Sequence, residues 1–78
     1  MEIGQKIETT TDDLFFPYIR AVNEEGYSYE LPAKYSGEIV KLNNKNKEGH
    51  SVGVSFNFHP NQKMVLYLKP KNIQTKTQ

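Results

Sequence analysis

The chain has 78 residues, a formal net charge of +1 and no cysteine. This length allows at most one small domain, and the lack of cysteine excludes disulfides and thiolate metal sites as supports for its core. No apolar run reaches the roughly 18 residues of a membrane span, and the first residues lack the basic and apolar segments of a secretory signal. We therefore expect a cytoplasmic protein.

The charges are distributed unevenly along the chain. Residues 1–30 contain two basic and seven acidic residues, a net charge of −5, whereas residues 31–78 contain eight basic and two acidic residues, a net charge of +6. This asymmetry allows two interpretations: the basic half binds an acidic or polyanionic partner, or the two halves neutralise each other across the fold.

Six short segments, separated by polar turns, have the length and pattern of β-strands. They cover residues 5–9, 18–22, 27–31, 37–42, 51–58 and 64–68. In the clearest of them the apolar residues share one face of a strand: Val52, Val54, Phe56 and Phe58. In the strand at 37–42 the same alternation predicts that Val40 and Leu42 point inward.

The connections carry typical turn residues. Residues 23–26 predict a hairpin turn with Gly26 at positive φ, and residues 43–49 predict a long polar loop. The chain has room for at most one short helical turn, at 10–13 or as a 3₁₀ turn at 69–73, because helical periodicity is absent. Residues 74–78 contain no apolar side chain and are predicted to form a flexible tail.

These elements predict an all-β domain over residues 1–73, a small barrel of five to six strands built around an antiparallel meander. Barrel closure is the economical way for a short chain to hide its strand edges. Three segments carry a resemblance to a known superfold: Gly37-Glu38-Ile39-Val40, Val52-Gly53-Val54 with residues 64–68, and the turn with last strand at 69–73.

In this order the segments resemble the SH3-like small β-barrels, mainly over residues 37–73. The resemblance implies a binding module, since KOW-type and Tudor-type members of this superfold bind nucleic acid, ribosomal or polymerase surfaces, or modified side chains. The chain has no tryptophan, so recognition of proline-rich peptides is not expected.

The run Met64 to Leu68 is apolar on both faces, which places Val65 and Tyr67 opposite the core residues. We expect either that Val65 and Tyr67 form an exposed contact patch or that residues 14–19 fold over them. Together with Phe15 and Tyr18 from the aromatic stretch, they are the predicted contact residues of a protein-binding module.

Nucleic-acid binding is the alternative function. Lysines that neutralise phosphates beside an aromatic side chain that stacks on a base are typical of small β-platforms. The candidate residues are Lys41, Lys45, Lys47, Lys63, Lys69, Lys71 and Tyr35. Because lysine reads bases poorly, such binding would depend on phosphates and therefore on salt.

Catalysis and metal binding have little support in the sequence. His50 and His59 flank one predicted strand and are expected at the surface, about 30 Å apart at ~3.3 Å per residue, which is too far for one metal ion. Glu38 or Glu48 with a histidine would supply an acid–base pair, but no spacing enforces it. We predict a non-enzymatic protein-interaction module without cofactor, of the kind found among phage or mobile-element accessory or inhibitory proteins.

Overall fold

A computed structural model describes residues 1–11, 15–45, 48–59 and 62–76 of the chain. The strands and the single 3₁₀ turn are β1 (Lys6–Thr9), β2 (Tyr18–Val22), β3 (Ser28–Pro32), β4 (Ser36–Lys41), β5 (Val52–His59), β6 (Gln62–Leu68), η1 (Pro70–Asn72) and β7 (Ile73–Thr75). The prediction of an all-β chain with at most one short helical turn is confirmed, and the turn is η1. The predicted helical turn at 10–13 falls partly outside the described residues.

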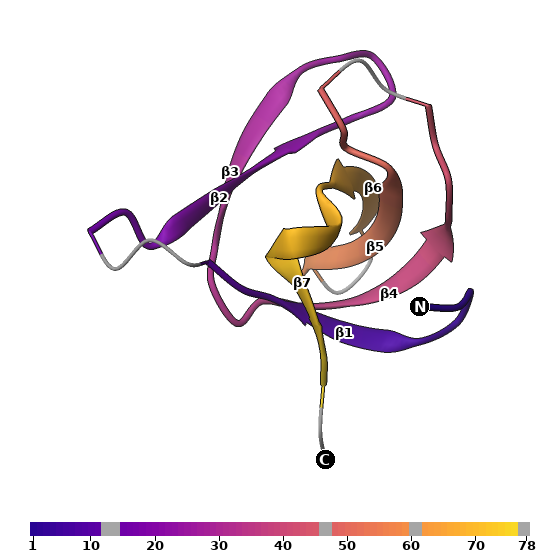
Figure 1. Cartoon of the computed structure of the whole chain (residues 1–78), viewed down its shortest axis with the longest axis horizontal. Coiled ribbons are helices and arrows are strands. Elements are labelled where there is room, and N and C mark those ends of the chain that lie inside the picture. Colours follow the sequence, from indigo (N-terminus) through magenta and orange to yellow (C-terminus); the bar gives the residue numbers. More distant parts are fainter. Residues whose placement is uncertain (12–14, 46–47, 60–61, 77–78) are drawn as a thin grey trace.

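All seven strands form one antiparallel sheet in the order β3-β2-β6-β5-β4-β1-β7 (Figure 1). The predicted count of five to six strands is therefore too low. Closure is also wrong, because β3 and β7 remain the edges of the described ladder. Two backbone hydrogen bonds extend the pairing of β1 with the chain before β4: Thr9 N donates to Tyr35 O over 2.9 Å, and Thr9 O accepts from Lys34 N over 2.7 Å.

The core lies inside the curl of this sheet. Buried residues from the strands form a single cluster: Ile7, Ile19, Ala21, Leu31, Ile39, Val52, Val54, Phe56, Leu66, Leu68 and Ile73. The alternation predicted for β5 is confirmed at Val52, Val54 and Phe56, while Phe58 is partly buried against the cluster. In Figure 1 the strands wrap around this common interior.

The inward face of β4 differs from the prediction. Ile39 is fully buried, whereas Val40 is 38% exposed. The pairing of β4 with β5 shifts between Ile39, opposite Val54, and Lys41, opposite Gly53, so Val40 is the extra residue of a β-bulge. A bulge resets the alternation, and Leu42 accordingly packs against the core as predicted.

Glycine is required at two positions where side chains of a neighbouring strand lie against the backbone. A Cβ atom on Gly37 would lie 2.5 Å from Cγ1 of Val54, and one on Gly53 would lie 2.9 Å from Cε1 of Tyr67. Both distances are far below van der Waals contact. Gly53 therefore makes room for the Tyr67 ring on the outer face of β5.

The predicted tail boundary is too early, because residues 74 and 75 belong to β7. This strand pairs with β1 through Ile7↔Thr75, Glu8↔Gln74 and Thr9↔Ile73. The side-chain amide of Gln74 donates to Glu8 Oε1 over 2.8 Å. The last strand was expected to end by residue 73, because residues 74 and 75 are polar. Residues 77–78 lie outside the described part.

Within the described residues, no helix has the length and apolar character needed to cross a membrane.

Candidate functional site

A groove of about 480 Å³ lies between β2, residues 48–50 and η1. Segments that are far apart in sequence supply its walls, because the sheet pairs the end of β2 with the end of β6, just before η1. Its volume falls within the range of roughly 300–1,000 Å³ that ligand sites occupy. We call this hollow the β2–η1 groove.

Aromatic side chains form one wall of the groove. Phe16 and Tyr18 both line it and are 52% and 47% exposed. Their ring centroids are 6.2 Å apart in an edge-to-face arrangement, the geometry that aromatic pairs prefer. Phe15, immediately before them, is 96% exposed. Exposed aromatic side chains of this kind frequently carry the energy of protein contacts.

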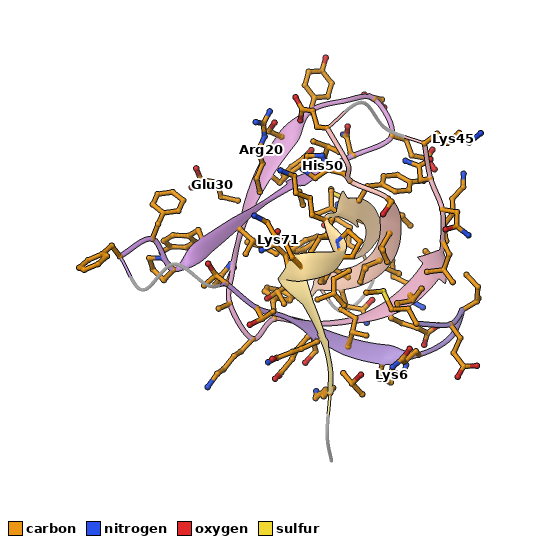
Figure 2. All side chains as sticks on the ribbon, viewed as in Figure 1. Lys6, Arg20, Glu30, Lys45, His50 and Lys71 are labelled. Atoms are coloured by element: carbon orange, nitrogen blue, oxygen red, sulfur yellow. The ribbon has the colours of Figure 1, made fainter. Side chains whose placement is uncertain are left out.

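The rest of the groove is mainly cationic. Arg20, Lys69 and Lys71 line it together with one carboxylate, that of Glu48. With His50 neutral, these side chains give the groove a net charge of +2. Figure 2 shows Arg20, His50 and Lys71 on neighbouring segments, while Lys6 and Lys45 lie at the periphery of the molecule.

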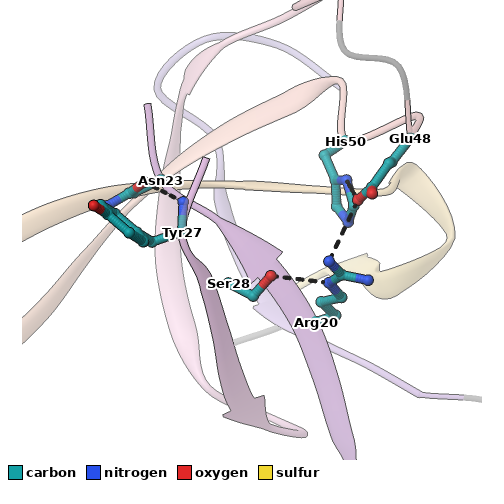
Figure 3. Close-up of polar contacts among 6 residues, drawn as sticks. All are labelled: Arg20, Asn23, Tyr27, Ser28, Glu48 and His50. Atoms are coloured by element: carbon teal, nitrogen blue, oxygen red, sulfur yellow. Dashed lines mark hydrogen bonds and ion pairs between the residues drawn. The ribbon is translucent and has the colours of Figure 1, made fainter. Parts of the chain in front are cut away.

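Hydrogen bonds hold the two walls in place. Asn72 in η1 is joined to Thr10 twice: Thr10 N donates to Asn72 O over 2.8 Å, and Asn72 Nδ2 donates to Thr10 O over 3.2 Å. On the opposite wall, Arg20 Nε donates to Ser28 Oγ over 3.1 Å (Figure 3). These bonds therefore fix η1, which carries Lys71, and the side chain of Arg20.

His50 lies beneath the groove and was expected at the surface. It is only 1% exposed, and its Nδ1 atom is buried without a hydrogen-bond partner. Burial lowers the pKa of His50 below its ordinary value of 6.5; Lys69 lowers it further, Glu48 opposes the shift and Arg20 reinforces it. His50 is therefore neutral at pH 7.

Glu48 stands between His50 and Arg20. Its Oε2 atom is 3.7 Å from His50 Nδ1 and 3.7 Å from Arg20 Nη2 (Figure 3). Both distances exceed the 2.7–3.2 Å of a hydrogen bond to nitrogen, so these are loose electrostatic contacts. The Glu48 side chain is 53% exposed.

The predicted contact patch of Val65 and Tyr67 on β6 is not an exposed surface. Tyr67 is 4% exposed, and its hydroxyl donates to Glu24 Oε1 over 3.0 Å. Burial and the bond to Glu24 raise the pKa of Tyr67 above its ordinary value of 10.0. The turn at 23–26, together with Gly53 beneath the ring, accommodates this side chain. From the aromatic stretch, Phe16, Tyr18 and Ile19 line the β2–η1 groove instead. Val65 is half-buried.

The lysines predicted for nucleic-acid binding do not gather in one place. Lys69 and Lys71 line the β2–η1 groove. Lys41 and Lys45 line another hollow with Glu24 and Tyr67, and Lys63 lines a third with Lys6 and Glu38. Lys47 lies outside the described residues.

Tyr35, proposed as the stacking residue, packs inward. Its ring centroid is 5.6 Å from that of Phe56 and 5.6 Å from that of Phe58, and its hydroxyl donates to Asn57 O over 3.4 Å. The side chain is half-buried in the aromatic end of the core, and it lines none of the three hollows that contain the lysines.

Sequence reasoning missed the combination of Arg20, Glu48 and His50. Arg20 is the only arginine of the chain, and Glu48 was considered only as one of two glutamates that could form an acid–base pair with a histidine. No signal in the polar run around residue 48 predicts that His50 is buried. In the part of the chain with described placement, no three His, Cys, Asp or Glu side chains come together as a metal site.

Comparisons with protein-family models, curated proteins and solved structures find no match to this chain. The site is therefore interpreted from its own geometry.

Proposed function

We propose that the chain is a protein-interaction module that binds an acidic and apolar segment of a partner protein in the β2–η1 groove. The observation that carries the proposal is the convergence, in one hollow, of the aromatic pair Phe16 and Tyr18 with the cations Arg20, Lys69 and Lys71. An extended segment would place an apolar side chain on the aromatic wall and a carboxylate near the cations.

The aromatic wall and the positive charge of the groove both support a ligand that is apolar and acidic. Apolar contact with half-exposed rings removes hydrophobic area from water on both partners, which is the main source of affinity. The net positive charge selects an acidic over a basic segment and accelerates its association. A neutral apolar ligand would leave the cations unused.

We also propose an SH3-like architecture for the module. Two features support it: the β2–β3 hairpin is inserted between β1 and the β4–β5–β6 meander, and the single turn η1 precedes a short last strand that pairs with β1. The open edges at β3 and β7 make it a curled sheet in which the ladder is incomplete.

Nucleic-acid binding is less well supported by the arrangement of charges. A phosphate backbone needs a continuous track of cations, whereas the described candidate lysines are divided among three hollows, each of which also contains a glutamate. The acidic turn that carries Glu24 and Glu25 adds repulsion close to Lys41 and Lys45.

The test measures binding of short synthetic ligands by fluorescence anisotropy. The probes are an unstructured peptide of glutamate, leucine and phenylalanine, the same peptide with lysine in place of glutamate, and a single-stranded oligonucleotide. We expect micromolar binding of the acidic peptide alone. Lys71→Glu should weaken it about tenfold, which corresponds to about 1.4 kcal/mol, and Tyr18→Ala should also weaken it because the aromatic wall is lost.

Lys45→Glu is the matched control, because it makes the same charge change in a different hollow. Equal weakening by Lys45→Glu and Lys71→Glu would overturn the assignment of the groove. Tighter binding of the oligonucleotide with steep salt dependence would replace the protein segment with nucleic acid. Dimers that dissociate on Lys71→Glu would identify the partner as a second copy, whose own acidic turn carries the exposed Tyr27.

A further inference from the structure

The inner end of the β2–η1 groove contains an anion position that is already occupied by the protein itself. One oxygen, Glu48 Oε2, lies 3.7 Å from Arg20 Nη2 and 3.7 Å from His50 Nδ1. It therefore stands between a permanent cation and a buried imidazole nitrogen, at distances that are too long for a hydrogen bond to either.

The two groups around this position are fixed, while the carboxylate is on a loop. Arg20 belongs to β2 and is held by Ser28, and His50 is 1% exposed. Glu48 lies between β4 and β5, in a connection closed by the bond from Asn44 N to Ser51 O over 2.9 Å. Its side chain is 53% exposed.

The buried Nδ1 atom of His50 gives the position its chemical preference. It has no hydrogen-bond partner, and a buried polar atom without one favours any ligand that supplies it. A neutral imidazole with its proton on Nδ1 donates to an oxygen, and the Arg20 guanidinium beside it favours an anionic one. A carboxylate at hydrogen-bond distance from both satisfies these requirements.

We propose that Glu48 is a built-in competitor: it holds the anion position in the free protein, and a carboxylate of the bound segment replaces it between Arg20 and His50. This inference rests on the function proposed above and adds a regulatory contact to the same groove. In this exchange the incoming carboxylate comes closer to Arg20 and His50 than Glu48 Oε2, which is 3.7 Å from each. The free protein thereby keeps Arg20 partly neutralised and disfavours weakly matching anions.

The test compares Glu48→Gln with Glu25→Gln, which removes the same charge from the exposed β2–β3 turn, outside the groove. With the acidic peptide as probe, we expect Glu48→Gln to bind about threefold to fivefold more tightly than the wild type, the size of one exposed ion pair. Glu25→Gln should change the affinity by less than about twofold, since it acts only through distance-screened charge. Equal gains in the two variants would overturn the proposal.

A second probe, phenylacetate, tests the anion position without a peptide. Its carboxylate should shift the side-chain nitrogen resonances of Arg20 and His50 in NMR spectra, and at lower concentration in Glu48→Gln than in the wild type. The peptide could bind while phenylacetate leaves the Arg20 and His50 resonances unchanged and Glu48→Gln leaves the peptide affinity unchanged. That result would overturn the proposal that Glu48 competes for the anion position, but not the proposal that the groove binds the peptide. If neither ligand binds, the proposed function itself fails.

Discussion

The Tyr67 ring lies across Gly53 on the outer face of β5, where a Cβ atom on residue 53 would be 2.9 Å from Tyr67 Cε1 and 2.9 Å from Lys41 Cβ. Because residue 53 has no side chain, a tyrosine on the outward face of β6 becomes almost completely buried. The bond to Glu24 then fastens it to the turn after β2.

Gly53→Ala should lower the free energy of unfolding by about 1–3 kcal/mol, since an added methyl group overpacks this contact. It should also expose the Tyr67 hydroxyl, so that its absorbance titrates at lower pH than in the wild type. Chemical denaturation and alkaline titration measure the two effects. Ser55→Ala on the same strand is the control, and a similar loss there would contradict the overpacking argument.

Thr9 connects the end of β1 to the β3–β4 connection through its hydroxyl. Oγ1 donates to Pro32 O over 2.7 Å and accepts from Tyr35 N over 2.9 Å, and the residue is fully buried. Thr9→Val keeps the shape but leaves both backbone groups without this partner, and it should cost about 1–3 kcal/mol of stability. Thr9→Ser keeps both bonds and loses one methyl group, about 0.8 kcal/mol. Denaturant unfolding measures the stability of both variants. A serine variant less stable than the valine variant would contradict the stabilising role of the Thr9 hydroxyl.

His50 should make folding stability depend on pH between neutrality and moderate acidity. Its pKa in the folded protein is below the ordinary 6.5, mainly because of burial, so below pH 6.5 the unfolded chain binds the proton first. The contribution of the neutral, buried His50 to the free energy of unfolding is complete above pH 6.5. It is lost as the pH falls from 6.5 toward the pKa of His50 in the folded protein. The charged groups that face it are Lys69, Glu48 and Arg20.

The measurement is urea denaturation of the wild type and His50→Gln from about pH 7.5 to about pH 5.5, a range that spans the ordinary pKa of histidine. We expect stability to fall more steeply with decreasing pH in the wild type than in the variant. Parallel curves would show that His50 does not carry the dependence. The lowered pKa of Glu38, caused by its bond to Lys6, acts only below pH 4.5 and does not interfere.

A chain ending at Ile73 should be less stable than a chain ending at Lys76 by about 1–2 kcal/mol, because it loses the Gln74 and Thr75 pairs with β1 and their hydrogen bonds. The chain ending at Lys76 retains every described contact of β7 and serves as the control. Thermal melts compare the unfolding midpoints of the two proteins. Identical midpoints would show that residues 74–76 add no stability and would support the predicted end of the domain at residue 73.

The strands were predictable wherever one face is buried and the alternation is unbroken, as in β5. The prediction failed where geometry interrupts the pattern. The bulge at Val40 changes parity without a sequence signature, since valine is an ordinary strand residue. Closure was expected because short barrels avoid edges, but β3 and β7 are left as short edges, which is another way to limit edge pairing.

The candidate site was predictable only in pieces. The aromatic stretch pointed to Tyr18 as a contact residue, and charge pointed to Lys69 and Lys71 for a different function. That these residues face one hollow depends on the curl of the whole sheet, which local patterns do not encode. The burial of His50 is likewise a property of the packing around it, because its neighbours in sequence are polar.

β2 joins the main ladder through a single residue pair, Val22↔Tyr67, in contrast to the seven pairs between β5 and β6. The wall of the groove that carries Tyr18 and Arg20 therefore belongs to a hairpin with few backbone bonds to the meander. Such a hairpin opens at lower free energy than the core strands. A ligand that contacts this wall and η1 together binds only the form in which the hairpin is docked on the meander. Binding therefore stabilises this form and slows the exchange of the hairpin amide protons with solvent.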